Sequence, residues 1–448
     1  MPSSAVLLDR AAVLDRFRRI RARTRALFDL LDPAVYYERP IRLRNPIVFY
    51  EGHLPAFAVN TLLKKGLGQA GVDAHLETIF ARGIDPDEES AAVARGNPAW
   101  PARDVVVAYA QEADRRLADA IARADLDRAD HPLLRGAQAL WTMLEHEEMH
   151  QETLAYIWHE APYAWKRKPE SYWTVPPRMR AAPAPARVSV PAGLATLGTT
   201  LVVSPPTIHD PPPIESFAWD NELPSHQQHV DAFTIDVHNV TNADYRAYVE
   251  ATGAAAPHFW ERDGGAWYWR AMFERVPLPA GWPVYVTWEQ ADAYARWRGR
   301  RLPTEAEFHR AAYGTPDGRE RRFPWGETMP NRAPGNFDFA RFDPEPVGSH
   351  PAGASAFGVH DLVGNGWEWT GDVFAPYDGF EAMASYPEYS AEFFDGEHFV
   401  MKGASPVTAR ALTRRGFRNW FRPRYPYVYA TFRCVSSEGR NSEGRSPA

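Results

Sequence analysis

The sequence predicts a multidomain chain in which a helical domain is followed by a mixed α+β domain. Residues 1–160 repeat apolar side chains at the spacing of amphipathic helices. From about residue 187 the expected strands are short, the loops are long, and Gly, Pro and Trp are frequent. A stretch rich in Pro and aromatic residues, ending in an Ala-Pro run, separates the two parts. We therefore predict domains at 1–165 and 187–440, joined by a Pro-rich linker at 166–186.

The first domain is predicted to be a four-helix bundle. Four long segments place apolar residues on one helical face, and these are residues 11–31, 46–66, 103–124 and 133–161. Pro55 lies inside the second segment and has no backbone N–H, so we expect it to kink that helix or to restart it just after His53. In the second domain we predict helices at 241–253 and 287–299, with Thr241 and Thr287 as N-caps.

Composition excludes several classes of function. The chain has 448 residues and a net charge of -7, which argues against a nucleic-acid-binding protein. Cys434 is the only cysteine, so a disulfide framework, a Cys-ligated zinc site and an iron–sulfur cluster are excluded within one chain. Neither a secretory h-region nor an apolar run of about 18 residues is present, and we expect a cytoplasmic protein without a membrane span. The 16 Trp residues fit pockets lined by indole rings.

The stretch LEHEEMHQET, residues 144–153, contains the candidate ligands of a metal site. His146 and His150 lie four residues apart, so on a helix they share one face with Met143, Leu154 and Ile157. This apolar stripe should point into the bundle and bury both imidazoles. Two histidines on such a face recur in metal sites of helix bundles, although hydrogen-bonded core histidines give the same pattern.

A third ligand must come from another helix. Glu152 lies two residues after His150, roughly 200° around the helix, and so cannot share the face of the histidines. His53 is the best candidate, because it is the only histidine of the second segment and has Phe49 and Phe57 at helical spacing on either side. Three histidines suit Zn, Fe(II) or Cu, and the spacing does not separate these metals.

Several motifs resemble one enzyme family. HEEMHQE, with FYEGH upstream, is similar to the DinB-like metal domain of the ergothioneine- and ovothiol-type sulfoxide synthases. VTNADYRAYV, RLPTEAEF and GNGWEWT resemble their formylglycine-generating-enzyme-like domain, which has a C-type-lectin-like fold. The resemblance implies a non-heme iron(II) held by His53, His146 and His150, with O2 and a thiol as co-substrates. It further implies that the thiol is oxidised and joined to the imidazole of hercynine (histidine betaine) or histidine.

The same resemblance assigns roles near the C-terminus. YPEYSAEFFDG is similar to the family segment whose tyrosine donates a proton or electron near the iron, so Tyr386 and Tyr389 are candidates and Tyr386 is preferred. FRNWFRPRYPYVYATFRC is similar to the segment whose Asn-Trp pair contacts the betaine, here Asn419 and Trp420. Aromatic faces bind quaternary ammonium groups, although these side chains could instead only pack the domain.

Departures from the family pattern bear on the substrate. The actinobacterial branch, which uses gamma-glutamylcysteine, has Asp after the Asn-Trp pair and Gln between the helix histidines, where this chain has Phe421 and Met149. Arg422 and Arg424 follow, and they could bind an anionic group or remain on the surface. These differences resemble the selenoneine synthase branch and favour a selenosugar donor and a C–Se bond to hercynine. The alternatives are a hercynine sulfoxide synthase that uses cysteine or gamma-glutamylcysteine, and a non-catalytic lectin-like binding protein.

Overall fold

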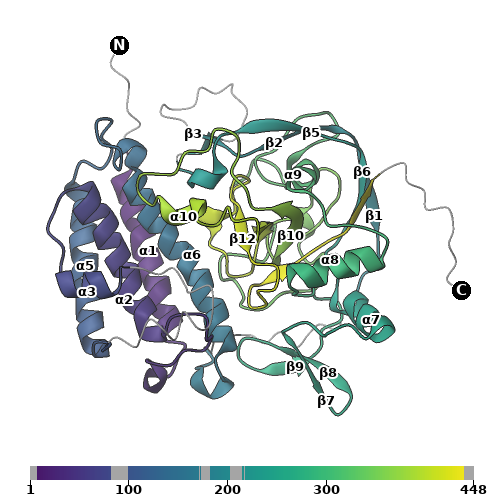
Figure 1. Cartoon of the computed structure of the whole chain (residues 1–448), viewed down its shortest axis with the longest axis horizontal. Helices are drawn as coiled ribbons and strands as arrows, with labels where there is room; N and C mark the ends of the chain where they lie inside the picture. Colours follow the sequence, from purple (N-terminus) through teal and green to yellow (C-terminus); the bar gives the residue numbers. More distant parts are fainter. Residues whose placement is uncertain are drawn as a thin grey trace, which may run out of the picture.

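Helices form the first part of the structure, a computed structural model that describes residues 8–81, 99–170, 172, 182–201, 214, 215 and 217–437. The predicted bundle is present, and α6 lies along its boundary with the second part (Figure 1). Its long helices are α1 (Arg10–Phe28), α2 (Ile47–Ala58), α5 (Arg103–Arg123) and α6 (Gln138–Glu160), accompanied by the short α3 (Ala74–Ile79) and by 3₁₀ turns at Pro33–Val35, Arg135–Ala137 and Tyr163–Trp165.

Local chemistry explains where the bundle helices begin and how they continue. The carboxylate of Asp9 accepts a hydrogen bond from the Ala12 N–H and caps α1. The restart that we predicted after His53 is wrong, because α2 runs through Pro55 and continues as a π-helix over Val59–Gly66. Nearly every side chain of α2 is buried, and this packing holds the helix together across the one missing N–H.

The second part consists of small sheets connected by long loops. Its central sheet has the strand order β12-β11-β10-β13, formed by Asn419–Phe421, Phe399–Ala404, Gly366–Val373 and Ala430–Thr431. The other sheets are β1 (Arg187–Val190), β6 (Phe233–Asp236) and β14 (Val435–Ser437); β2 (Gly193–Leu197) and β5 (His226–Val230); β3 (Thr200–Leu201) and β4 (Ile214–Glu215); and β7 (Trp260–Asp263), β8 (Ala266–Arg270) and β9 (Arg275–Pro277). The 3₁₀ turns are Asp220–Glu222, Pro351–Gly353 and Arg410–Leu412.

Both helices predicted in this part are confirmed. They are α7 (Asn242–Thr252) and α8 (Trp288–Trp297), and Thr241 and Thr287 are their N-caps. The prediction missed α9 (Glu305–Tyr313), which begins with a capping box between Thr304 and Glu307, and the single turn α10 (Glu388–Ala391).

The central sheet brings two distant motifs together. Trp367, in GNGWEWT on β10, lies opposite Gly403 of β11, and Val400 of β11 lies opposite Trp420 of β12. β12 is one of the two edge strands, and it places the Asn-Trp pair at the side of the sheet that faces α6 (Figure 1).

One hydrophobic core continues from the bundle into the second part. It includes Leu27 and Trp158 from the bundle together with Tyr285 and Tyr429 from the second part. The Nδ1 atom of His159 on α6 is 2.8 Å from the Tyr429 hydroxyl, so the boundary is tied by polar contacts as well. The two parts therefore form one packed unit, and α6 belongs to both.

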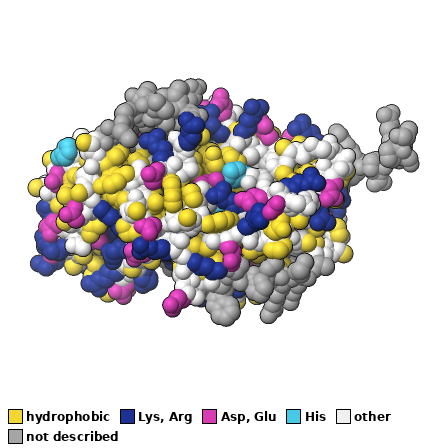
Figure 2. Space-filling model, turned by 90° about the horizontal axis from the view of Figure 1, so that it is seen from below, with side chains coloured by type: hydrophobic (Ala, Val, Ile, Leu, Met, Phe, Trp, Pro, Cys, Tyr) yellow, Lys and Arg dark blue, Asp and Glu magenta, His cyan; other side chains and the backbone are white. Residues whose placement is uncertain are grey.

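The surface carries mixed charge. On the face shown in Figure 2, basic and acidic side chains are interspersed among apolar ones. Within the described ranges, no helix is both long enough and apolar enough to cross a lipid bilayer.

Candidate metal centre and substrate cavity

Three histidines from two helices converge inside the molecule. His53 comes from α2, and His146 and His150 come from α6; candidate ligand atoms of the three lie within 4.8 Å of one another. The ring centroids are 5.2 Å apart for His53 and His146, 5.1 Å for His53 and His150, and 4.5 Å for the pair on α6. Among the residues that the structure describes, no other cluster of His, Cys, Asp or Glu has this spacing.

The chemistry of these imidazoles fits a divalent transition metal. The His53 Nδ1 atom is 2.8 Å from the Phe80 carbonyl oxygen, so Nδ1–H donates and Nε2 keeps its lone pair. His53 Nε2, His146 Nδ1 and His150 Nδ1 are all buried without a hydrogen-bond partner, which is unusual for polar atoms in a protein interior. Burial lowers the pKa of His53 to about 4 and the pKa values of the other two well below 6.5. All three rings are therefore neutral near pH 7, the form in which imidazole binds a metal.

Packing holds the rings in place. Gly52 precedes His53 and allows α2 to approach Phe80, because a Cβ atom at residue 52 would lie 2.3 Å from the Phe80 ring. Phe57 stacks on His146 with ring centroids 3.5 Å apart. Gly52, the glycine in FYEGH, therefore allows the close packing that places the Phe80 carbonyl oxygen next to His53.

The acidic residues of the LEHEEMHQET stretch have partners away from the histidines. Glu152, which helical geometry excluded as a ligand, accepts hydrogen bonds from three donors on the second part: Trp367 Nε1 at 2.8 Å, Ser405 Oγ at 2.6 Å and Thr408 Oγ1 at 2.8 Å. The remaining pairs are Glu145 with Arg414, Glu147 with Arg21, and Glu148 with Arg16. These acids attach α6 to its surroundings.

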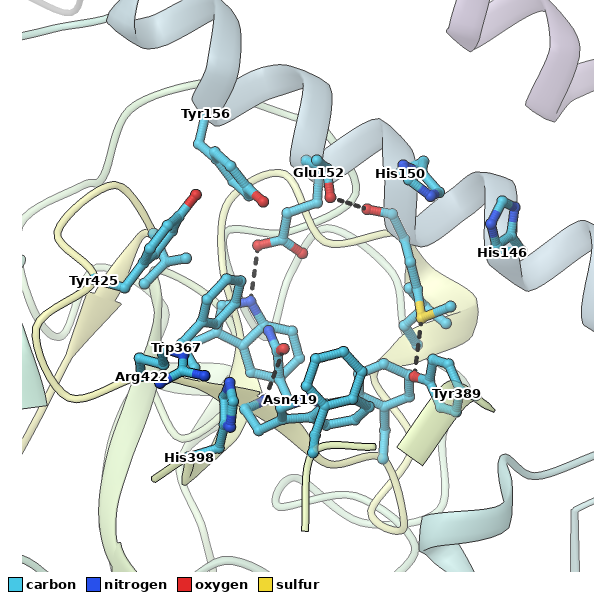
Figure 3. A pocket seen from close by; sticks show the side chains of 18 of the residues that line it. His146, His150, Glu152, Tyr156, Trp367, Tyr389, His398, Asn419, Arg422 and Tyr425 are labelled. Atoms are coloured by element: carbon cyan, nitrogen blue, oxygen red, sulfur yellow. Dashed lines mark hydrogen bonds between the residues drawn. The ribbon is translucent and has the colours of Figure 1, made fainter. Parts of the chain in front are cut away.

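A cavity of about 320 Å³ opens beside His146 and His150. Figure 3 shows both histidines at one end, with Tyr156 and Tyr425 at the other. The walls come from α6, from the 43–44 loop, from the segment around α10 and from β12 and the loop after it. The site therefore exists only where the two parts of the chain meet.

Both candidate tyrosines line the cavity. The Tyr386 ring lies 6.1 Å from the His146 ring. The Tyr389 hydroxyl donates to the Sδ atom of Met149 at 3.2 Å, and its ring lies 4.0 Å from that of Trp219. Burial raises the pKa of Tyr389 well above its usual value of 10, so its hydroxyl stays protonated.

The predicted betaine-binding residues also line the cavity. Trp420 is backed by Phe374, whose ring is stacked on it at 4.2 Å, while the side-chain Oδ1 atom of Asn419 accepts a hydrogen bond from the backbone N–H of Trp420 at 2.9 Å. Phe421 stacks on Tyr425 at 5.0 Å. These contacts fix the aromatic wall before any ligand binds.

The two predicted arginines lie in different places. Arg422 lines the cavity and pairs with Glu397. Arg424 lies on the surface, paired with Glu289 at 2.7 Å, and is not part of the lining. Sequence reasoning missed Arg44, which lines the cavity from the loop before α2 and carries no motif that would have marked it.

The comparisons with known proteins identify the family. Residues 173–438 match the sulfatase-modifying factor enzyme 1-like domain, and residues 16–154 match the DinB superfamily. A protein named hercynine oxygenase from Mycolicibacterium smegmatis is 30% identical over 458 residues, which cover 96% of this chain and 99% of that protein. The chain belongs to the ergothioneine-type sulfoxide synthase family. The predicted family and fold class are confirmed.

Other members of the sulfoxide synthase family match over part of their length. A hercynine oxygenase from Mycolicibacterium thermoresistibile is 37% identical over 259 residues, covering 52% of this chain and 57% of that protein. Ergothioneine biosynthesis protein 1 of Schizosaccharomyces pombe is 29% identical over 436 residues, covering 91% of this chain and 54% of that protein. The chain thus spans little more than half the length of these two relatives. The name hercynine oxygenase, carried by two of these relatives, is that of an oxygen-dependent oxidative enzyme.

Proposed function

We propose that this chain is a non-heme iron(II) enzyme that uses O2 to join the imidazole of hercynine to selenium or sulfur, with a selenosugar as the favoured donor. The convergence of three neutral imidazoles, two buried and that of His150 partly buried, at one end of an aromatic-walled cavity carries the proposal. Relatives named hercynine oxygenase support hercynine as the acceptor substrate.

His53, His146 and His150 would hold the metal. Iron(II) bound there would supply the activation of O2, because three neutral ligands leave positive charge and open coordination positions. The Phe80 carbonyl fixes the ring orientation and tautomer of His53, as the outer partner of a metal-binding histidine normally does.

Asn419 and Trp420 would bind the betaine. A quaternary ammonium group has no N–H to donate and is bound through aromatic faces, so the Trp420 ring, held from behind by Phe374, suits it. Tyr386 would donate a proton or an electron, because its ring lies next to that of His146. Tyr389 is the second candidate, and its contact with Met149 keeps its hydroxyl within the cavity wall.

Two apolar side chains support the selenosugar. Phe421 and Met149 line the cavity at positions where the gamma-glutamylcysteine branch has Asp and Gln. Neither can pair with the ammonium group of an amino-acid thiol, whereas an aromatic wall suits the apolar face of a sugar ring. A hercynine sulfoxide synthase that uses cysteine or gamma-glutamylcysteine is the second candidate, favoured by the names of the relatives. A lectin-like binding protein is the third.

A donor competition assay tests the proposal. Protein loaded anaerobically with iron(II) receives hercynine and one donor at a time (a selenosugar, cysteine or gamma-glutamylcysteine), and mass spectrometry follows the products after O2 is admitted. We expect a C–Se product with the selenosugar, and no product from His150→Ala, which should also bind less iron. Turnover with gamma-glutamylcysteine alone would refute the role given to Phe421. Full iron binding by His150→Ala would refute the metal centre.

A further inference from the structure

We infer that Arg44 binds the carboxylate of a substrate at the end of the cavity away from the metal-binding histidines. The inference rests on the proposed function and adds to it a residue that selects substrates by charge. Arg44 belongs to the loop before α2, the helix that carries His53, and lines the same cavity as His146 and His150.

The position of Arg44 follows from its contacts with α6. Its guanidinium lies over the Tyr156 ring at 5.4 Å. Tyr156 follows His150 by six residues, which corresponds to about 9 Å along the helix. A small substrate whose reactive group lies at the histidines can therefore extend its other end toward Arg44.

Aromatic contacts hold the Arg44 guanidinium in a fixed plane. It lies over the Tyr425 ring at 5.2 Å as well as over Tyr156, and its Nε donates to the Tyr425 hydroxyl at 2.8 Å. Tyr425 in turn stacks on Phe421, whose ring forms part of the cavity wall. A guanidinium held in this way loses little side-chain entropy when it forms a forked pair with a carboxylate.

Charge complementarity indicates what Arg44 binds. Hercynine carries a quaternary ammonium group, for which Trp420 offers an aromatic face, and also a carboxylate that needs a cationic partner. Glu152, an acid in the same wall, is engaged by three hydrogen-bond donors. Arg44 places a guanidinium beside Tyr156, at the end of the cavity opposite the histidines.

A carboxylate could come from hercynine or from an amino-acid donor, and paired ligands separate these sources. The dissociation constant is measured by calorimetry on the anaerobic iron-loaded protein, first for hercynine and for its decarboxylated analogue, the imidazolylethyl trimethylammonium ion. With hercynine present, cysteine is then compared with cysteamine. The variants are Arg44→Met and the control Arg262→Met, which removes an exposed arginine that also lies over an aromatic ring, Trp267, outside the cavity.

We expect Arg44→Met to weaken the binding of one carboxylate ligand roughly 10- to 100-fold and to leave its decarboxylated counterpart unchanged. Loss confined to hercynine assigns the carboxylate to the betaine, and loss confined to cysteine assigns it to the donor. Equal loss for both members of each pair, or no loss for any ligand, would overturn the inference. If wild-type protein bound neither hercynine nor its analogue, the proposed function would fail and the inference with it.

Discussion

Arg414 lies between two carboxylates in the interior, and its loss is expected to destabilise the protein strongly. Its two terminal nitrogens donate to the Glu145 carboxylate, both at 2.9 Å, and its Nε donates to Glu222 at 2.8 Å. The three side chains are 6%, 5% and 0% exposed, so water does not screen the pairs. Glu145 precedes His146 on α6, and this cluster therefore connects the helix that carries His146 and His150 to the second part.

The expected magnitude follows from what would remain. Arg414→Met leaves two buried carboxylates without their shared cation, and breaking a buried pair in this way costs about 3–5 kcal/mol. Trp219 Nε1 still donates to Glu145 at 3.0 Å, and Arg16 lies 3.8 Å from it, so part of the compensation survives. We therefore expect a loss of about 3 kcal/mol in the free energy of unfolding, at the lower end of that range.

Urea unfolding followed by tryptophan fluorescence measures this loss. Arg410→Met is the matched control, because Arg410 pairs with Asp338 at 3.0 Å while half exposed, and such pairs contribute about 1 kcal/mol or less. If Arg414→Met does not fold, Arg414→Lys retains the charge and should lose less. A loss for Arg414→Met no larger than that of the control would refute the reasoning.

His53→Ala is expected to lower the affinity for iron(II) by more than about 10-fold in equilibrium dialysis. His75 is an exposed histidine on α3, and the control His75→Ala should not change the affinity. Equal affinities of the two variants would contradict the three-histidine site. Gly52→Ala forces a methyl group against Phe80 and should lower the free energy of unfolding by about 1–3 kcal/mol while weakening metal binding. An unchanged thermal unfolding temperature would mean that the Phe80 ring can move away without cost, contrary to this expectation. Burial raises the pKa of Asp343 to about 6, so between these pH values the folded protein keeps a proton on this carboxyl that the unfolded chain releases near the ordinary pKa of 3.8. The stabilisation from this bound proton is complete below pH 3.8 and is lost as the pH rises through 6. Relative to Asp343→Asn, the wild type should therefore lose up to about 3 kcal/mol of unfolding free energy between pH 4 and pH 7 in urea titrations. Parallel pH profiles for the two proteins would contradict this expectation.

Sequence periodicity predicted the helical bundle well, because its signal is local. Thr241 and Thr287 marked helix starts through a single side chain each, and both starts are present. The capping box of Thr304 and Glu307 is an equally clear start signal in the sequence. We nevertheless missed α9, because a short helix in a loop-rich stretch shows little helical periodicity. The restart that Pro55 suggested is absent, because burial around α2 outweighs one absent hydrogen bond.

Parts of the site depend on contacts that no local pattern records. Spacing placed His146 and His150 on one face, and the structure brings His53 beside them. Arg44 is different, because its place in the cavity depends on Tyr425, 381 residues further along the chain. Contacts of such separation are set by the packing of the two parts, which periodicity and capping signals do not encode.

The continuous core has a consequence for how the chain could be divided. Tyr156 and His159 of α6 are buried and pack against aromatic rings of the second part, so a fragment ending at residue 165 would expose this aromatic helix face to water. Such a fragment would aggregate or bind another apolar surface, although the three histidines of the proposed metal site would all be present. The helical half and the lectin-like half must therefore be expressed, mutated and exchanged between relatives as one unit, with the α6 boundary transferred intact.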